Sequence, residues 1–327
     1  MTMDWTRAAE LLQQARQIVA VTHVNPDGDA IGSLLGLTWA LRKLGKQVIP
    51  AVDEGVPPEF AFLPGADEVQ AALSDVNPEL VVAVDCGDME RMGAVGAVAV
   101  ASGAPIINLD HHITNTRFGH ANLVDPGTVA AAEGVLDWLE HLAVGLDTTI
   151  ATCLLTGIVT DTLCFRTDNV TAKVLGKAQR LMDAGAPLHV ITQRTVMRKP
   201  YEALQLWAAV LPGMTLEPEG VLWVAIDRPT LESLHYTANR DGGLVSLLIS
   251  ADRANIAAVF REKADGRIEV GFRAVPGFDV SGVAVALGGG GHPLAAGCTI
   301  DGPLSAAVGR VLPLLKQAAV EGAPVVR

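Results

Sequence analysis

Histidine and carboxylate side chains recur in this sequence at spacings that could bind divalent metal ions. The candidates are His23, Asp27, Asp29, Asp85, Asp110, His111, His112 and Asp161. Carboxylates mixed with imidazoles suit Mn²⁺, and less clearly Mg²⁺ or Zn²⁺. Several carboxylates in one crevice repel each other unless cations compensate their charge. If one carboxylate were shared by two ions about 3.5–4 Å apart, the ions would activate a bridging water and hold a phosphate for attack.

Strands that alternate with helices would bring these residues together. Short apolar runs typical of buried strands cover 18–23, 47–52, 80–85 and 105–112. Helical periodicity covers 4–17, 30–44, 129–142, 148–162 and 170–184. This alternation implies a parallel sheet with helices on both faces, and such sheets bind ligands outside the carboxyl ends of their strands. Because acids or histidines follow three of these strand ends, we expect the metal site along that edge.

Each piece taken alone also has a structural explanation. The run from Asn25 to Asp29 could be only a turn and a helix cap, and Asp85 could be only a turn residue at a strand end. A lone histidine such as His23 is more often structural than a ligand. The joint pattern favours a metal site. The remaining histidines have no such setting, and we expect surface or structural roles for His120, His141, His189 and His235.

A second region follows the Gly- and Pro-containing punctuation at 184–187. A connecting helical segment covers 188–211, strand-like runs cover 221–227, 255–261 and 268–273, and helical patterns cover 241–251 and 303–320. We therefore expect an α/β protein with a doubly wound, mainly parallel N-terminal domain, a smaller C-terminal α/β domain and an active site in the cleft between them. The expected boundaries are a catalytic domain at 1–186, a linker at 187–205 and a substrate-binding domain at 206–327.

Composition limits the function classes. The chain has 327 residues, of which 50% are hydrophobic but only 4% aromatic, so its cores must consist mainly of Ala, Val, Leu and Ile. It has 24 Lys and Arg against 36 Asp and Glu, a net charge of −12 that argues against broad binding of long nucleic acid. A short nucleotide held by a few groups or by metal ions remains compatible with this charge.

No segment is predicted to be a signal peptide or a membrane span. The first ten residues carry charge, and the uncharged stretches 92–109 and 280–300 are interrupted by polar, Pro or Gly residues. The cysteines show no paired spacing and are expected to be small buried residues in a reducing compartment: Cys86, Cys153, Cys164 and Cys298. We expect a soluble, cytoplasmic protein.

The ordered set of acids and histidines resembles the motifs of the DHH phosphoesterase superfamily. The matching segments are His23-x-Asn25-Pro26-Asp27-Gly28-Asp29-Ala30, Asp85, Asp110-His111-His112 and Asp161. The run from Gly288 to His292 is similar to the signature of the DHH-associated C-terminal domain. The resemblance covers nearly the whole chain, and the family members of this size that it most resembles are the nanoRNase/pAp-phosphatase proteins, to which stand-alone cyclic-dinucleotide phosphodiesterases are closely related.

The resemblance implies a ligand set for two metal ions. One ion would be held by His23 and Asp27, the other by Asp29, His111 and Asp161, with Asp85 bridging both. The ions are expected to be Mn²⁺, with Mg²⁺ or Co²⁺ as alternatives.

The resemblance also implies roles around the metal ions. His112 would reach the substrate phosphate and take part in protonating the leaving oxygen, and Asp110 would orient a histidine. Asn25 would lie near the metal site and the phosphate. The catalytic set is therefore expected to be His112, Asp110 and Asp85.

Substrate recognition is expected mainly from the second domain. The run Gly288, Gly289, Gly290 and Gly291 would let backbone N–H groups approach a phosphate, beside His292 and Arg273. Arg117 and Arg166 are further candidate phosphate contacts that could equally form surface ion pairs. Relatives of the nanoRNase type often follow the arginine with Ser and Lys, whereas Ala274 and Val275 stand here, a departure that puts pAp phosphatase activity in doubt.

The expected function is Mn²⁺-dependent hydrolysis of short RNA or DNA oligonucleotides and of linear dinucleotides such as pApA, with cyclic di-AMP as a further substrate. The alternatives are a pAp (3',5'-bisphosphate) phosphatase and a non-catalytic cyclic-dinucleotide sensor. A manganese pyrophosphatase and a RecJ-type exonuclease fit less well, because the first lacks the four-glycine signature and the second needs a larger chain. A homodimer is expected from base rates alone.

Overall fold

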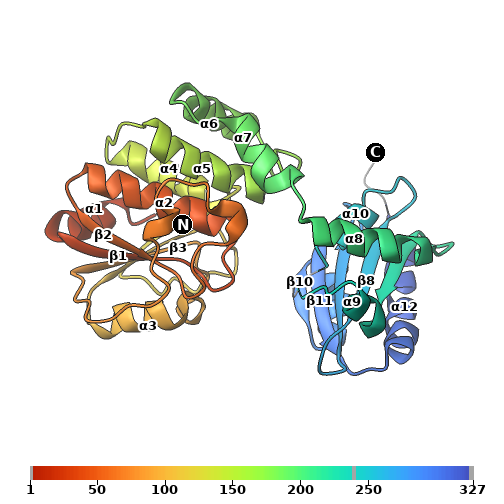
Figure 1. Ribbon diagram of the computed structural model, residues 1–327. Coiled ribbons are helices and arrows are strands. Elements are labelled where there is room, and N and C mark those ends of the chain that lie inside the picture. The colour runs from red at the N-terminus through yellow and green to blue at the C-terminus, as the bar shows by residue number, and fades with distance from the viewer. Residues whose placement is uncertain (1–2, 238–240, 324–327) are drawn as a thin grey trace. The chain divides into compact units, whose positions relative to one another are not determined.

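The computed structural model describes residues 3–237 and 241–323. The chain forms two compact units, Met1–Arg198 and Lys199–Arg327, each with its own sheet (Figure 1). The division falls inside the range 187–205 that the sequence marks as a linker. No helix within the described ranges is long and apolar enough to cross a membrane.

The first unit is built on a five-stranded, wholly parallel sheet. Its strands are β1 (Gln17–Val21), β2 (Gln47–Ala51), β3 (Leu80–Val84), β4 (Ile106–Asp110) and β5 (Ala121–Val124), in the order β2-β1-β3-β4-β5. Every residue of β3 and β4 is buried, as expected for strands covered on both faces. Because all five strands run the same way, their carboxyl ends share one edge.

Helices cover both faces of this sheet, which confirms the predicted α/β fold (Figure 1). The first unit contains α1 (Trp5–Gln14), α2 (Gly28–Lys43), α3 (Gly93–Ala101), α4 (Ala131–His141), α5 (Thr148–Asp161), α6 (Ala172–Asp183) and α7 (Leu188–Thr192). One face packs on α2, α4 and α5, where Leu34 of α2 lies in one core with Ile18 and Val82. The other face packs on α3, through Val95 beside Val19.

Helices α2 and α5 approach each other unusually closely, because glycines face the contact. A Cβ atom built on Gly32 would lie 2.6 Å from the carbonyl oxygen of Cys153 and 2.8 Å from the backbone nitrogen of Gly157. One turn earlier, a Cβ on Gly28 would lie 2.4 Å from Oγ1 of Thr160. All three distances are shorter than side chains allow, so glycine is required for this packing. The contact brings the start of α2 to the end of α5.

The second unit is built on a six-stranded mixed sheet. Its strands are β6 (Thr215–Leu216), β7 (Val221–Ile226), β8 (Ile256–Glu262), β9 (Ile268–Ala274), β10 (Gly290–His292) and β11 (Ala295–Ile300), in the order β10-β11-β9-β8-β7-β6. Strands β7 and β8 are parallel, and all other neighbours are antiparallel. Its helices are α8 (Tyr201–Val210), α9 (Arg228–Ser233), α10 (Leu244–Leu248), α11 (Ser281–Ala286) and α12 (Leu304–Glu321).

The two faces of this second sheet are covered unequally. Helices α11 and α12 pack on one face, where Leu315 meets the core formed by Phe260 and Phe272. On the other face, α8 and α10 cover β7 and β8, with Leu206 and Val259 in a common core. Short helical turns complete the chain at η1 (Pro58–Phe60), η2 (Ala66–Glu68), η3 (Glu90–Met92), η4 (Gln193–Met197) and η5 (Leu211–Gly213).

Several elements differ from what the sequence patterns predict. Helix α3 is formed entirely of Ala, Val and Gly, so no polar face marks its period. The glycine run is only partly a loop, because Gly290 and Gly291 lie in β10 and pair with β11. The connecting segment 188–211 is not one helix, since it is interrupted before Pro200, where proline disfavours a helical residue ahead of it.

Candidate functional site

The eight predicted acids and histidines lie together at the carboxyl edge of the first sheet. His23 and Asp85 follow β1 and β3, and Asp110 ends β4 directly before His111 and His112. The first turn of α2 supplies Asp29, its N-cap is Asp27, and the last residue of α5 is Asp161. The close contact between α2 and α5 therefore carries two of the acids to the strand ends.

Asp85 is at the centre of this cluster. Its carboxylate is buried, with Oδ2 3.4 Å from Nε2 of His23 and Oδ1 3.7 Å from Nε2 of His111. Its backbone adopts a φ of 57°, which is uncommon for a residue with a side chain. Oδ1 is buried without a hydrogen-bond partner in the described structure. A buried anionic oxygen without a donor is costly, so its position suits a bound cation.

Candidate ligand atoms form three groups around Asp85, within each of which they lie no more than 4.8 Å apart. The groups are His23 with Asp27 and Asp85, Asp29 with His111 and Asp161, and Asp85 with His111 and His112. The first group contains the residues that the resemblance assigns to one ion, and the second contains those assigned to the other ion apart from the shared Asp85; their metal roles stay predictions. The arrangement has the carboxylates and imidazoles that a dinuclear site for borderline-hard cations requires.

His23 presents a lone pair to this cluster. Its Nδ1 donates to the carbonyl oxygen of Val24 at 2.8 Å, so the neutral ring keeps Nε2 unprotonated on the side of Asp85. Burial would lower the pKa of His23, but the interactions with Asp85, the carbonyl of Val24 and the charge of Asp27 together outweigh burial and raise that pKa. The negative charge of the cluster therefore attracts either a proton or a metal ion to Nε2.

Asp29 is fully buried and accepts hydrogen bonds from the start of α4. Oδ2 accepts from the N–H of Ala131 at 2.5 Å, and Oδ1 accepts from the N–H of Ala132 at 2.9 Å and from Oγ of Ser33 at 3.0 Å. Burial and the nearby carboxylates, of which Asp85 contributes most, nevertheless raise its pKa well above the ordinary value. The donors at this helix start favour the anion, but without a cation they do not offset its neighbours.

The other acids of the cluster show the same crowding. Burial raises the pKa of Asp161 to about 6, assisted by the charge of Asp85 and opposed by that of His111. Nε2 of His111 lies 3.8 Å from Asp29 and 3.7 Å from Asp161. Carboxylates whose pKa rises in this way are destabilised as anions, and a bound divalent cation would reverse that effect.

His112 and Asp110 form an ion pair at the edge of the cluster. Nδ1 of His112 donates to Oδ1 of Asp110 at 2.8 Å. This bond raises the pKa of His112 to about 9 in spite of partial burial. Although burial alone would raise the pKa of Asp110, the bond from His112 lowers it. The pair therefore holds a protonated imidazole at neutral pH beside the predicted metal centre.

Asn115 is a member of the site that the motifs do not reveal. Its Nδ2 donates to Oδ2 of Asp110 at 2.5 Å, to the carbonyl oxygen of Cys86 at 3.0 Å and to Oδ1 of Asn108 at 2.9 Å. Nδ2 of Asn108 donates to the same carbonyl oxygen of Cys86 at 3.0 Å. A signal was present in the sequence, because a polar Asn108 inside an apolar strand requires buried partners.

The other predicted residues of the first unit lie around this edge. Asn25 is exposed in the turn between β1 and α2, with a φ of 56°. The backbone N–H of Arg117 donates to Oδ1 of Asn115 at 2.6 Å, and its Nη2 donates to the carbonyl oxygen of Val124 at 3.3 Å. Arg166 is exposed and its Nε donates to the carbonyl oxygen of Leu163 at 2.7 Å. Phosphate contacts by these three residues stay predictions.

In the second unit, Arg273 and His292 lie in one row across the sheet. Arg273 of β9 pairs with Ala295 of β11, and Ala295 pairs with His292 of β10, so all three side chains project from the same face. The small Ala295 leaves space between the two. Arg273 also lines a cavity of about 780 Å³ together with Gly288 and Gly289. A phosphate contact by this row stays a prediction.

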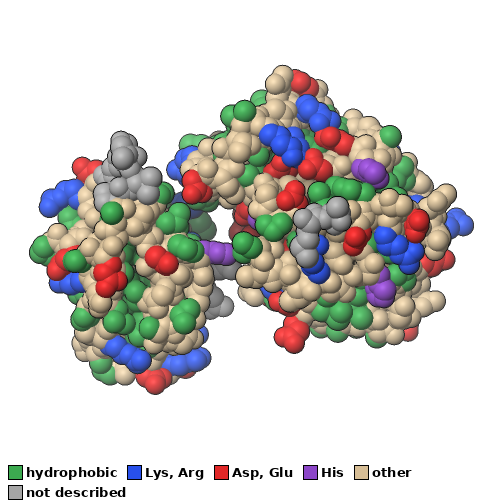
Figure 2. Space-filling model, turned by 180° about the vertical axis from the view of Figure 1, so that it is seen from behind, with side chains coloured by type: hydrophobic (Ala, Val, Ile, Leu, Met, Phe, Trp, Pro, Cys, Tyr) green, Lys and Arg blue, Asp and Glu red, His purple; other side chains and the backbone are tan. Residues whose placement is uncertain are grey.

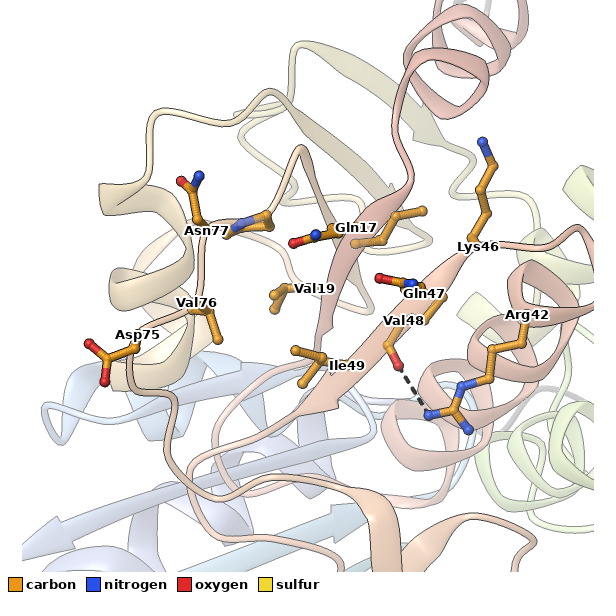
Figure 3. Close-up of a pocket in the computed structure, with 12 residues that line it drawn as sticks. Gln17, Val19, Arg42, Lys46, Gln47, Val48, Ile49, Asp75, Val76 and Asn77 are labelled. Atoms are coloured by element: carbon orange, nitrogen blue, oxygen red, sulfur yellow. Dashed lines mark hydrogen bonds between the residues drawn. The ribbon is translucent and has the colours of Figure 1, made fainter.

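A separate cavity of about 450 Å³ lies at the opposite, amino edge of the first sheet (Figure 3). Val19, Ile49 and Val76 form its apolar part. The two basic side chains that line it already form hydrogen bonds. Arg42 donates to the carbonyl oxygen of Val48, and Lys46 donates to those of Leu12 and Ala15. This cavity offers neither the metal ligands nor the position expected of an active site in a parallel sheet.

Basic side chains form no continuous patch on the surface drawn in Figure 2, where Lys and Arg are scattered among acidic and neutral groups. This distribution agrees with the net charge of −12. A surface of this kind gives a long nucleic acid strand few phosphate contacts outside the site itself.

The chain matches two family models. Residues 17–158 match the model described as "DHH family, N-terminal domain", and residues 232–321 match the model of the DHHA1 domain. The chain is 36% identical over 313 residues to a protein of Thermus thermophilus named "Bifunctional oligoribonuclease and PAP phosphatase NrnA", covering 94% of this chain and 92% of the relative. A protein of Bacillus subtilis with the same name is 33% identical over 294 residues, covering 86% and 89%.

Solved structures show the same fold. An exopolyphosphatase-related protein from Bacteroides fragilis aligns with a TM-score of 0.89 and 23% identity, covering 97% of this chain and 98% of the other. RecJ from Thermus thermophilus in complex with Mn²⁺ aligns with a TM-score of 0.56 and 16% identity, covering 100% of this chain and 56% of RecJ.

Proposed function

The chain belongs to the DHH family, and from that premise we propose that it is a Mn²⁺-dependent phosphodiesterase that hydrolyses short oligonucleotides and dinucleotides to mononucleotides. The observation that carries the proposal is the buried Asp85 carboxylate, whose Oδ1 lacks a donor amid two groups of metal-type ligands. Phosphodiester hydrolysis is among the reactions that dinuclear metal centres catalyse, and the names of the relatives favour it here.

The residues of the cluster fit two divalent cations. We assign His23 and Asp27 to one ion, Asp29, His111 and Asp161 to the other, and Asp85 to both. When bound, such ions lower the pKa of water and neutralise charge on a phosphate under attack. Mn²⁺ is the preferred identity because it accepts mixed carboxylate and imidazole ligands, and Mg²⁺ and Co²⁺ are alternatives.

His112 would act on the substrate from the edge of the cluster. Its Nδ1–H is fixed by Asp110, so Nε2 of the protonated ring faces away from that carboxylate and can donate a hydrogen bond to a phosphate oxygen. The same Nε2–H can supply a proton to the leaving oxygen of the cleaved ester. Asp110 keeps the ring oriented and its charge stabilised.

The substrate class follows from charge, from the second unit and from the relatives. The acidic protein attracts long polyanions poorly, whereas a short strand needs few contacts. Arg273, His292 and the glycines from Gly288 to Gly291 would hold a phosphate. The relatives with 36% and 33% identity are named oligoribonucleases. We place the reaction on fragments of a few nucleotides in the cytoplasm, with cyclic di-AMP as a further substrate opened at the same centre.

A pAp phosphatase activity is the second candidate, because the relatives carry that activity in their names. Against it stand Ala274 and Val275 after Arg273, where a hydroxyl and a cation would favour a terminal phosphate. The two activities use the same metal cluster and differ in which phosphate is presented to it.

The test is time-resolved chromatography of the full chain with Mn²⁺ and four separate substrates: pApA, cyclic di-AMP, pAp and a long RNA. We expect rapid conversion of pApA to AMP with the long RNA nearly untouched. Asp85→Asn, which keeps the size of the side chain but not its charge, should reduce turnover to a few per cent or less.

Each result separates the candidates. Cleavage of pAp without pApA would replace the phosphodiesterase by a phosphomonoesterase. Binding of Mn²⁺ and cyclic di-AMP without turnover would favour a sensor. Unchanged turnover by Asp85→Asn would exclude the cluster as the catalyst.

A further inference from the structure

One half of a sheet face in the second unit is left open as a cavity. Helices α8 and α10 cover this face over β7 and β8, with Val245 of α10 packed in the same core as Val259. Beyond Val259 the face continues over β9 and β11, where the cavity of about 780 Å³ lies. The covered part therefore forms a wall, and the open strands form the floor.

The floor is a row of three glycines across neighbouring strands, of which Gly271 and Gly297 line the cavity and Gly290 continues the row beside it. Gly271 of β9 pairs with Gly297 of β11, and Gly297 pairs with Gly290 of β10. A Cβ atom built on Gly271 or on Gly290 would meet no other atom within 4 Å, so the space above both is open. At a strand spacing of about 4.8 Å, the row offers a flat backbone surface about 10 Å wide.

A row of polar and charged side chains lies along each side of this floor. Arg273 and His292 form the row on one side, two residues or about 7 Å along the strands. On the other side, Arg261 of β8 is paired through Nε and Nη2 with Glu269 of β9, at 2.9 and 2.7 Å. Its guanidinium plane is thereby fixed at the edge of the cavity, where such planes stack on flat rings.

We propose that this glycine floor binds the nucleobase of the nucleotide whose phosphate lies on the row of Arg273 and His292. The assignment of the ligand as a nucleotide rests on the proposed function. About 7 Å between the two rows matches the span of a ribose between a 5'-phosphate and its base. Every base has a flat face, and a floor without side chains lets that face approach the peptide planes closely.

The substitution Gly271→Val tests the floor without disturbing the fold. The new side chain would project into open space, and a β-branched residue is favourable in a strand. It would occupy the room above the floor and leave Arg273 unchanged. Thr215→Val, a strand substitution at an exposed residue of β6 outside the lining of the cavity, is the matched control.

The experiment compares binding of AMP and of ribose 5-phosphate, which has the same phosphate and sugar but no base. Calorimetric titration of the full metal-free chain would give both dissociation constants for wild type, Gly271→Val and Thr215→Val. For wild type and Thr215→Val we expect AMP to bind at least about tenfold more tightly than ribose 5-phosphate. For Gly271→Val we expect the two ligands to bind alike, at the wild-type affinity for ribose 5-phosphate.

Two results would overturn the inference. Wild type could bind the two ligands equally, which would show that the base makes no contact of consequence. Gly271→Val could weaken both ligands by the same factor, which would place the effect on the phosphate. Because the readout is binding, a protein that fails to hydrolyse pApA would contradict the proposed function without affecting this measurement.

Discussion

At the scale of single residues, the cluster combines groups that disfavour one another when no cation is present. The buried Asp85 has an oxygen without a donor, and burial with neighbouring carboxylates raises the pKa of Asp29 and Asp161. Asp110 differs, because His112 and Asn115 donate to it and keep its pKa low. The acids that burial and like charge destabilise as anions are thus separate from the acid that accepts a hydrogen bond from His112.

Asn115 is expected to act as a positioning residue. Asn115→Ala removes the donor to Asp110 and the link to Cys86, so His112 loses its fixed orientation. We expect the kcat for pApA to fall about 10- to 100-fold, with a smaller change in KM. Asn122→Ala, in the neighbouring strand β5, is the control and should keep full activity. Equal kcat values for the two variants would refute this role.

At the scale of elements, the site depends on how closely two helices approach. Gly28 and Gly32 allow α2 to contact α5, and this contact places Asp29 near Asp161. Gly157 contributes from the other helix, since a Cβ there would lie 2.6 Å from Cβ of Ala132 and 2.7 Å from Oδ1 of Asp29. The low aromatic content of 4% is consistent with cores that rely on close backbone contact.

Gly32→Ala should destabilise the protein although alanine favours helices. The added methyl would collide with the backbone of α5 at Cys153 and Gly157, an overpacking that costs about 1–3 kcal/mol. Gly176→Ala in α6, where a Cβ meets nothing within 4 Å, should stabilise by about 0.5–1 kcal/mol. Urea unfolding of both variants measures the difference. If Gly32→Ala proved as stable as Gly176→Ala, the inferred close contact between α2 and α5 would be wrong.

At the scale of the whole molecule, the acidic groups crowded at one site make the folding stability of the metal-free protein depend on pH. Raised pKa values of Asp161, His23 and His112 all mean that the folded, metal-free protein binds protons more tightly than the unfolded chain. For Asp161 this contribution is complete below the unfolded value of 3.8 and is lost as the pH rises through about 6. For His112 it is complete below 6.5 and is lost as the pH approaches about 9.

The metal-free protein should therefore lose thermal stability between about pH 5 and pH 8, and Mn²⁺ should restore it. At one hundred times its dissociation constant, an ion adds about 2.7 kcal/mol, or roughly 5–10 °C in Tm. We expect this gain to be larger at about pH 8 than at about pH 5, because protons compete with Mn²⁺ at the lower pH. Calorimetry with and without Mn²⁺ measures it, and Asp161→Asn should flatten the pH dependence. A Tm gain that does not vary with pH would contradict the expectation.

Much of this organisation could be predicted from the sequence. The alternation of apolar runs and helical patterns predicts the parallel sheet, and the acids at its strand ends predict where a ligand site lies. Asn115 could not be found in this way, because its partners belong to two other segments, Cys86 just after β3 and Asn108 in the middle of β4. The hairpin of β10 and β11 was hidden because its glycines and alanines carry no hydrophobic alternation, and only pairing with β9 makes it a strand pair. The metal and phosphate roles of the individual residues stay predictions.

Asp29 contacts both the start of α4 and the predicted metal centre. The backbone amides of α4 can therefore report whether a metal ion is bound. Its Oδ2 accepts from the N–H of Ala131 and lies 3.8 Å from Nε2 of His111, on the side of the predicted metal centre. Any cation that draws charge from this oxygen must weaken the hydrogen bond to that N–H. The amide signals of Ala131 and Ala132 in a nuclear magnetic resonance spectrum would therefore change when a cation binds, and this readout needs no substrate.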